Sequence, residues 1–206
     1  MTSPNALHFD TRYHIYNRGN NREDIFVEGR NYEHFLNLYI KYVEPVAITL
    51  AYCLLRNHFH FMVRIKSETE INLWKDSQLE ESKISNSNPS RRFSNFFNSY
   101  VKAINHAYGR TGSLFQHPFG RVMITDENQF WNVIAYIHQN PQKHKFVTDF
   151  RNWNWSSYND ILSNELTMVN RNEVLELFGG KQNFMELNSQ WVSDANSKYM
   201  EKDDKD

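Results

Sequence analysis

Two strand-like runs of the sequence are separated by only two residues, and this closeness constrains the fold more than any other feature. Residues 46–55 form an apolar run, and a second strand-like run follows over residues 58–65. Arg56 and Asn57 between them leave room only for a tight turn. The sequence therefore predicts a β-hairpin, and with it a sheet that is antiparallel at this point.

The spacing of apolar residues elsewhere predicts the elements around this hairpin. Alternation is typical of a strand, and apolar residues three or four positions apart are typical of a helix. Pro45, Gly109 and Pro141 stand where three helices would end. In chain order, the predicted elements are a strand over 12–17, a helix over 31–43, the two hairpin strands, a helix over 91–108, a strand over 119–124 and a helix over 127–140.

This order is βαββαβ with a further helix, which is the ferredoxin-like order of an α+β fold. We expect an antiparallel sheet with helices packed on one face. Residues 67–90 are polar and predict either a mobile loop or a short helix within a loop. Short segments after residue 152 predict a C-terminal helical extension, and we expect its acidic end over 201–206 to be disordered. The expected boundaries are a domain over 10–152 and an extension over 153–206.

The composition excludes several classes of protein. Hydrophobic residues make up 40% and charged residues 23% of the 206 residues, so a core can be buried and global disorder is excluded. The single cysteine, Cys53, excludes a disulfide within the chain. No stretch approaches the roughly 20 apolar residues of a membrane span, and no signal peptide precedes the first strand. We therefore expect a cytoplasmic protein.

The net charge of −1 says nothing about nucleic acid, but the distribution of charge does. Residues 91–151 carry 8 Lys and Arg against 3 Asp and Glu, whereas residues 152–206 carry 5 against 10. A basic middle with an acidic tail fits a protein with a locally positive face for nucleic acid. Chance clustering of charges on a solvated surface remains the alternative.

His58 and His60 stand two positions apart in a predicted strand, so their side chains point to the same face. Phe59 and Phe61 then point to the opposite face, toward the core. Two imidazoles on one rigid face supply half of a metal site, and we expect the pair to face an open site. The His-x-His spacing alone is weak evidence, because it also occurs without a metal.

Tyr136 and Asn140 are four positions apart in a predicted helix and share a face. An oxygen of Asn140 suits the same metal ion, and Tyr136 suits attack on a phosphate bound there. A phenol with a pKa near 10 is almost entirely protonated at neutral pH, so it needs a phosphate polarised by a divalent ion. The alternative is a tyrosine that packs on the sheet and an asparagine that caps the helix.

The motifs together resemble a known family. His58-Phe-His60 resembles the His-hydrophobic-His motif of the HUH endonucleases, and Tyr136-Ile-His-Gln-Asn-Pro141 resembles the helix of the single-tyrosine, TnpA-like transposases, most similarly the REP-associated tyrosine transposases. The resemblance covers about residues 10–160. Three further segments look like that branch: His14-Ile-Tyr-Asn-Arg-Gly-Asn-Asn-Arg22, Tyr108-Gly-Arg-Thr-Gly-Ser-Leu-Phe-Gln116 with Phe119-Gly-Arg121, and Trp155-Ser-Ser-Tyr158.

The resemblance implies that residues 10–152 are a catalytic domain that cleaves and rejoins single-stranded or hairpin DNA through a 5′-phosphotyrosine. It implies that His58, His60 and Asn140 bind Mg²⁺ or Mn²⁺ and that Tyr136 is the nucleophile. Tyr100 and Tyr108 are rival nucleophiles on the other long helix. Many relatives have Trp-x-Gly-Arg where this chain has Phe-Gln-His-Pro-Phe-Gly-Arg, so the role of that turn is in doubt. The resemblance leaves the choice between a monomer and a homodimer open, because insertion-sequence relatives are dimers that share the tyrosine between subunits, whereas REP-associated members can act as monomers.

The loop over residues 18–22 resembles the segment with which REP-associated members read the foot of a hairpin. Arginine and asparagine side chains are suited to base edges, although a plain polar turn is an equal alternative. The remaining basic residues are expected to contact phosphates. The candidate DNA-binding residues are Arg18, Asn20, Asn21, Arg22, Arg91, Arg92, Arg110, Arg121 and Lys143, with Lys102 and Lys145 as further phosphate contacts.

Two other functions remain open on the residues alone. The same order of elements occurs in RNA-binding sheets, on which Tyr52 and Phe59 would stack bases without any catalysis. A metal hydrolase would use water in place of the tyrosine. A covalent protein–DNA adduct separates both from the tyrosine mechanism.

Overall fold

The computed structural model describes residues 6–77 and 88–190, and at its centre is a four-stranded antiparallel sheet with the strand order β2-β3-β1-β4. This is the strand order of a ferredoxin-like fold, as the sequence predicts. The strands are β1 (Arg12–Arg18), β2 (Ala47–Leu55), β3 (His58–Ile65) and β4 (Gly120–Ile124).

The predicted hairpin is formed by β2 and β3, and a turn at Arg56 and Asn57 joins its strands. The central strand β1 pairs with β3 on one side and with β4 on the other. Gly19, directly after β1, donates its backbone N–H to the carbonyl of Asn57 over 2.8 Å. The turn of the hairpin and the end of β1 are therefore held together.

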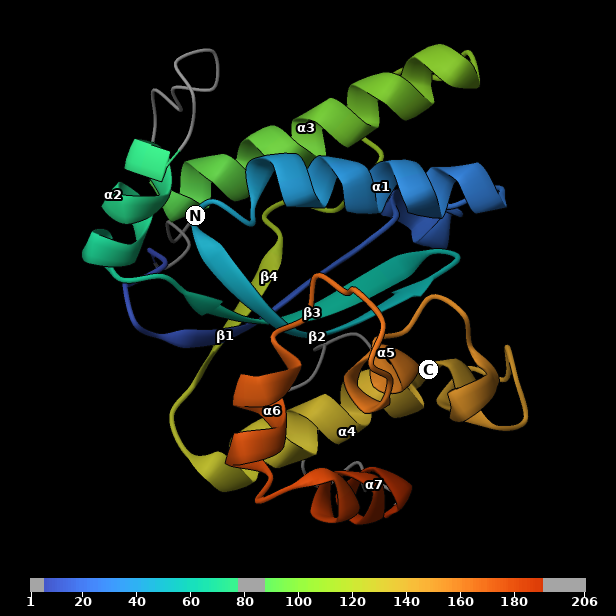
Figure 1. Ribbon diagram of the computed structural model, residues 1–206. Coiled ribbons are helices and arrows are strands. Elements are labelled where there is room, and N and C mark those ends of the chain that lie inside the picture. Colours follow the sequence, from blue (N-terminus) through green and yellow to red (C-terminus); the bar gives the residue numbers. More distant parts are fainter. Residues whose placement is uncertain (1–5, 78–87, 191–206) are drawn as a thin grey trace.

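Helices α1 (Gly29–Tyr42) and α3 (Pro89–Ala107) cover one face of the sheet (Figure 1). Aromatic rings fill the space beneath them: the ring of Tyr39 stacks on Phe61 at 4.3 Å, and Phe35 lies 5.0 Å from Phe59. Phe59 and Phe61 therefore point into the core, as their alternation with the histidines predicts. The predicted glycine at the end of α3, Gly109, has a φ of 61°.

Helix α4 (Glu127–Lys143) lies on the opposite face of the sheet, where it contacts β2 and β3 (Figure 1). The sequence predicts the end of this helix at Pro141, but the helix continues to Lys143. Pro141 removes one helical hydrogen bond and its ring crowds the preceding turn, but the next turn still forms because the backbone N–H of His144 bonds to the carbonyl of Asn140.

The residues after 152 form a helical extension that packs on α4 and on the edge of β2. The backbone N–H of Leu54 bonds to the carbonyl of Trp155 over 2.9 Å, so the edge strand is covered. The boundary at residue 152 remains a prediction, and the expected disorder of the acidic end falls on residues that the structure does not describe. The short helix η3 (Phe150–Asn152) precedes this part, and its own helices are α5 (Tyr158–Leu162), α6 (Arg171–Leu177) and α7 (Lys181–Ser189).

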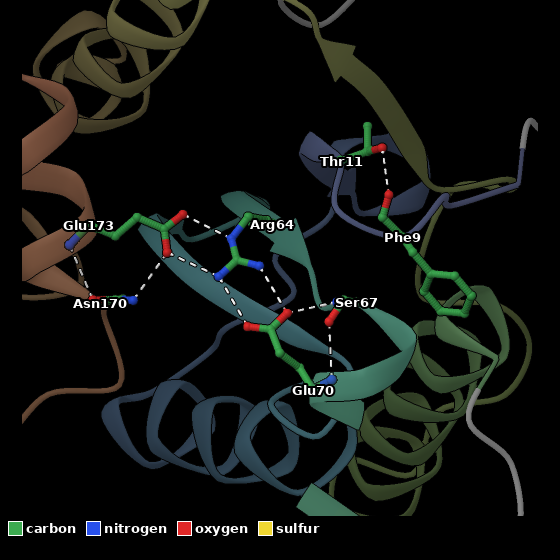
Figure 2. A network of polar contacts seen from close by, with 7 residues as sticks. All are labelled: Phe9, Thr11, Arg64, Ser67, Glu70, Asn170 and Glu173. Carbon is green, nitrogen blue, oxygen red and sulfur yellow. Dashed lines mark hydrogen bonds and ion pairs between the residues drawn. The ribbon is translucent and has the colours of Figure 1, made fainter. Parts of the chain in front are cut away.

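The polar segment after β3 contains a helix, α2 (Glu68–Ser77), so the alternative of a short helix within the loop is confirmed. Figure 2 shows how α2 and α6 are tied to the sheet through the guanidinium of Arg64. This group bonds to Glu70 of α2 over 3.1 Å and to Glu173 of α6 over 3.0 Å. Within the described residues, no helix is long and apolar enough to cross a membrane.

Candidate active site

The predicted metal ligands and the predicted nucleophile come together between the sheet and α4. His58 and His60 project from β3 toward α4, and Tyr136 and Asn140 project from α4 toward them. The Nε2 atom of His58 lies 3.1 Å from Oδ1 of Asn140. The ring of His60 lies 5.4 Å from that of Tyr136, edge to face.

His14 of β1 is a further member of this cluster, and its role was not predicted. Its Nε2 atom lies 3.0 Å from Nδ1 of His60, and the two rings are stacked. The alternation of β1 predicts that His14 and Tyr16 share a face. The pairing of β1 with β3, in which Tyr16 lies opposite His60, brings that face to the histidines, and the sequence contains no signal for this register.

Each ring nitrogen of His58 faces a side-chain oxygen. Its Nδ1 atom lies 2.7 Å from Oδ1 of Asn57 and its Nε2 atom faces Oδ1 of Asn140, so an oxygen acceptor lies at each ring nitrogen. A neutral imidazole has only one N–H. When Nδ1–H donates to Asn57, the lone pairs of Nε2 and of Asn140 face each other, and a cation between them satisfies both.

His60 completes this arrangement. Burial lowers its pKa well below the usual value, and His14 and His58 nearby lower it further, so the ring is neutral. Among the described residues, the buried Nε2 atom of His60 has no hydrogen-bond partner. A neutral imidazole whose other nitrogen is hydrogen-bonded is the usual histidine ligand of a metal.

These donors fit a divalent ion through two imidazoles and one amide oxygen. Within residues 6–77 and 88–190, no group of three or more His, Cys, Asp and Glu side chains is arranged to hold a metal ion. The fit therefore depends on Oδ1 of Asn140 as the third protein ligand. Mg²⁺ and Mn²⁺ favour oxygen ligands such as the amide of Asn140, whereas the two imidazoles are ligands that later transition metals favour.

The site is more enclosed than expected. The sequence predicts that the histidine pair faces an open site, but His58, His60 and Asn140 are at most 1% exposed and Tyr136 is 3% exposed. The expectation was wrong because helix α4 lies directly over this face of the sheet.

Half-buried side chains form the rim of the site. The Nζ atom of Lys143 lies 5.2 Å from the centre of the Tyr136 ring, so this predicted DNA-binding residue stands beside the predicted nucleophile. The ring of His144 lies 4.8 Å from that of His58. Tyr16 is also half-buried, and its ring lies 5.0 Å from His14.

The loop after β1 turns sharply and exposes its tip. Gly19 is required there, because a Cβ atom at this position would lie 2.2 Å from the carbonyl oxygen of Glu23. Asn20 is held inward, since its side-chain amide donates to the carbonyl of Ser113 over 3.0 Å. Asn21 and Arg22 are exposed, with φ angles of 53° and 60°. Arg18, in contrast, is buried and lies close enough to His60 to lower its pKa.

The other basic candidates do not converge on the site. Arg91 is exposed, whereas Arg92 is buried and donates to the carbonyls of Lys41 and Tyr42 at the end of α1, which is a structural contact.

The side chains of two more basic candidates make contacts with other residues of the protein. Arg110 pairs with Glu23 over 2.5 Å, which joins the segment after α3 to the loop after β1. Arg121 lies opposite Ile15, on the α3 side of the sheet, with its guanidinium 3.9 Å from the centre of the Phe119 ring.

The rival tyrosines lie on the α3 side of the sheet, away from the histidines. The hydroxyl of Tyr100 donates to the carbonyl of Ile25 over 2.6 Å, and burial raises the pKa of this phenol. The hydroxyl of Tyr108 bonds to Glu28 and, over 3.1 Å, to Asn31. Tyr136 is thus the tyrosine of these three that stands beside the histidine pair.

Comparison with known proteins identifies a similar fold. A solved structure described as a REP-associated tyrosine transposase bound to a REP hairpin superposes with a TM-score of 0.60, covering 81% of this chain and 88% of the other. The two sequences are 16% identical, so the likeness concerns the fold. No family model and no curated protein sequence matches the chain.

Proposed function

We propose that this protein is a metal-dependent endonuclease and strand transferase for single-stranded DNA, of the HUH tyrosine transposase kind. The observation that carries the proposal is the meeting of His58, His60, Asn140 and Tyr136 in one buried cluster, although they come from a strand and a helix far apart in the sequence. The shared fold with a transposase that binds a REP hairpin supports DNA, and hairpin-bearing DNA in particular, as the substrate.

Each residue of the cluster has a defined task in this proposal. His58, His60 and Asn140 would hold Mg²⁺ or Mn²⁺, and the ion would supply Lewis-acid polarisation of the scissile phosphate. His14 accepts the Nδ1–H of His60 and so directs the Nε2 lone pair of that ring to the ion. Lys143, beside the Tyr136 ring, stabilises the negative charge of the phosphate and of the attacking oxygen.

In the reaction, Oη of Tyr136 attacks phosphorus and loses its proton, while the bond from phosphorus to the 3′ oxygen breaks. The products are a 5′-phosphotyrosine and a free 3′-hydroxyl. Attack of a 3′-hydroxyl on the phosphotyrosine then restores the phenol and joins the strands. The covalent intermediate conserves the phosphodiester bond energy, which a hydrolysis would lose.

The burial of the cluster implies how the substrate arrives. Tyr136 is 3% exposed, so a phosphate reaches it only after the cluster opens, and we propose that the C-terminal end of α4, where Lys143 and His144 lie, is the part that moves. The helix end is a suitable hinge because Pro141 removes one backbone hydrogen bond from its last turn.

The structure disfavours the non-catalytic alternative. Base stacking on the sheet would require exposed aromatic rings, but Tyr52 is 7% exposed and Phe59 is fully buried. The hydroxyl of Tyr52 bonds to Asp160 of the extension, so this ring is part of the core. A hydrolase that uses water is the remaining rival, and it shares the metal site.

A trapping experiment tests the proposal. The protein is incubated with Mn²⁺ and 5′-labelled and 3′-labelled single-stranded hairpin oligonucleotides, and covalent adducts are resolved on denaturing gels. We expect an adduct with the wild type and with Tyr108→Phe, no adduct and no cut with Tyr136→Phe, and no cut with His58→Ala. Circular dichroism shows whether each variant folds.

The outcomes separate the candidates. An adduct that mass spectrometry locates on a tyrosine other than Tyr136 refutes the assignment. Cleavage without an adduct supports the hydrolase. Normal cleavage by His58→Ala contradicts the metal site.

A further inference from the structure

His138 belongs to the helix that carries the proposed nucleophile, but the proposed reaction gives it no task. It lies two positions after Tyr136 and two before Asn140. Each residue of a helix turns by about 100°, so the His138 side chain points roughly 160–200° away from those two. Helix α7 packs on α4 (Figure 1), and His138 is fully buried. The imidazole therefore makes its contacts outside the active-site cluster.

Both ring nitrogens of His138 are hydrogen-bonded to the C-terminal extension. Nδ1 lies 2.7 Å from Oδ1 of Asn188 in α7, and Nε2 lies 3.0 Å from Oγ of Ser157. The amide of Asn188 is oriented by its Nδ2 group, which donates to the carbonyl of Phe184 over 2.8 Å. An amide oxygen only accepts, so Nδ1 carries the proton, and Nε2 of the neutral ring accepts the hydroxyl proton of Ser157. One tautomer thus satisfies both nitrogens.

The same network reaches the sheet. Oγ of Ser157 accepts the backbone N–H of Tyr52 over 2.8 Å. Tyr52 lies in β2 directly opposite Phe61 of β3, the residue after His60. His138 therefore connects α4 to α7 through one ring nitrogen and, through the other, to the strand that pairs with the histidine-bearing strand.

The neighbouring residue, Gln139, makes a second connection to α7. Its Nε2 atom donates to the carbonyl of Asn188 over 2.8 Å and to that of Gln190 over 2.7 Å. Apolar packing alone lets a helix slide or rotate, whereas a fully satisfied polar network specifies one arrangement. Two consecutive residues held in this way fix the rotation of α4 about its axis.

We infer that His138 and Asn188 are positioning residues that hold α4 at one rotation about its axis. This rotation turns Tyr136 and Asn140 toward the histidine pair, so the inference rests on the proposed function. Side-chain ends lie about 5–6 Å from a helix axis, and a rotation of about 10° therefore moves them by about 1 Å. A misplacement of this size lowers a reaction rate by up to about 100-fold. The network ends before Pro141, so the last turn of α4 can move while the nucleophile stays in place.

Single-turnover cleavage and metal binding test this inference. Asn188→Leu has a side chain of similar shape but leaves Nδ1 of His138 without its acceptor. We expect cleavage of a single-stranded hairpin oligonucleotide in Mn²⁺ to slow by about 100-fold. Mn²⁺ binding without DNA, measured by electron paramagnetic resonance, should weaken by about 10-fold or more. Binding of the oligonucleotide in EDTA should be unchanged, because the buried network does not contact DNA.

A conservative variant separates positioning from simple destabilisation. In His138→Asn, the amide nitrogen can take the place of Nδ1 and donate to Asn188. This variant should cleave faster and bind Mn²⁺ more tightly than His138→Leu, which has no donor. Gln139→Met removes the amide that bonds to the end of α7, and it takes the place of Asn188→Leu in the same assays if that variant does not fold.

The matched control is Val174→Ala, which shortens a fully buried side chain of α6 in the extension but is no part of the hydrogen-bonded network. It should keep the wild-type cleavage rate and Mn²⁺ affinity. Circular dichroism shows which variants fold. Wild-type rates and Mn²⁺ affinity in the folded network variants, or equal losses in Val174→Ala, overturn the inference alone. Absence of cleavage by the wild type overturns the proposed function and this inference together.

Discussion

Gly120 is the position at which a single methyl group should disturb the candidate active site. It lies directly opposite Tyr16 in the pairing of β4 with β1. The Tyr16 ring covers it so closely that a Cβ atom at position 120 would lie 2.2 Å from Cζ, 2.3 Å from Cε2 and 2.6 Å from Cε1. Carbon atoms in ordinary contact are about 3.5–4.0 Å apart, so in Gly120→Ala the ring must move.

The size of the effect follows from two opposing contributions. Overpacking of this kind destabilises a protein by about 1–3 kcal/mol. Replacing a strand glycine by alanine stabilises it by about 0.5–1 kcal/mol, because the unfolded chain loses conformational freedom. The ring of Tyr16 is half-buried and can turn outward, which favours the lower half of the first range. We therefore expect Gly120→Ala to lower the free energy of unfolding by about 1 kcal/mol.

A double-mutant cycle isolates the clash. In a Tyr16→Ala background the obstructing ring is absent, so Gly120→Ala should raise the free energy of unfolding by about 0.5–1 kcal/mol. Urea denaturation of the four proteins measures both steps. Mn²⁺ titration of Gly120→Ala should also show weaker binding, because Tyr16 packs against His14 and His60. An equal change in both backgrounds would refute the reasoning, since the effect would then not depend on the ring.

Three further predictions concern the fold and the loop over residues 18–22. Arg64→Met should lower the free energy of unfolding by about 1–3 kcal/mol, because it leaves two partly buried carboxylates without their cation. The control is Arg151→Met, which breaks an exposed ion pair. It should change the free energy of unfolding by less than about 1 kcal/mol in the same urea titration. Burial raises the pKa of the Cys53 thiol, so iodoacetamide at pH 8 should label it only after denaturation; rapid labelling of the native protein in a mass-spectrometric time course would contradict this. Arg22→Ala should weaken binding to a cognate hairpin more than to random single strands, and equal weakening in an anisotropy assay would mean that the loop contacts phosphates alone.

The parts of the site that follow from local geometry could be predicted from the sequence. A spacing of two in a strand places His58 and His60 on one face, and a spacing of four in a helix places Tyr136 and Asn140 on another. The placement of each pair on one face follows once the strand or helix that carries it is predicted correctly. The structure brings the two pairs together, with Nε2 of His58 at 3.1 Å from Oδ1 of Asn140.

The parts that depend on how elements meet could not be predicted. His14 joins the site because β1 pairs with β3 in one particular register, and a shift by one residue would turn it into the core. The burial of the histidines depends on α4 crossing the second face of the sheet. Periodicity predicts that helix but contains no information on which face it covers.

Strand β1 connects recognition to catalysis in the proposed reaction. Side chains alternate along a strand, so His14 and Tyr16 point to the buried histidines while Asn17 points to the other face of the sheet, toward α3. The loop that follows carries Asn21 and Arg22 at an exposed tip, between the two faces. In the proposed reaction, DNA bound at this loop therefore acts on the end of β1, and His14 of β1 contacts His60. Correct binding can then orient a metal ligand without touching it, which would couple the choice of DNA to cleavage.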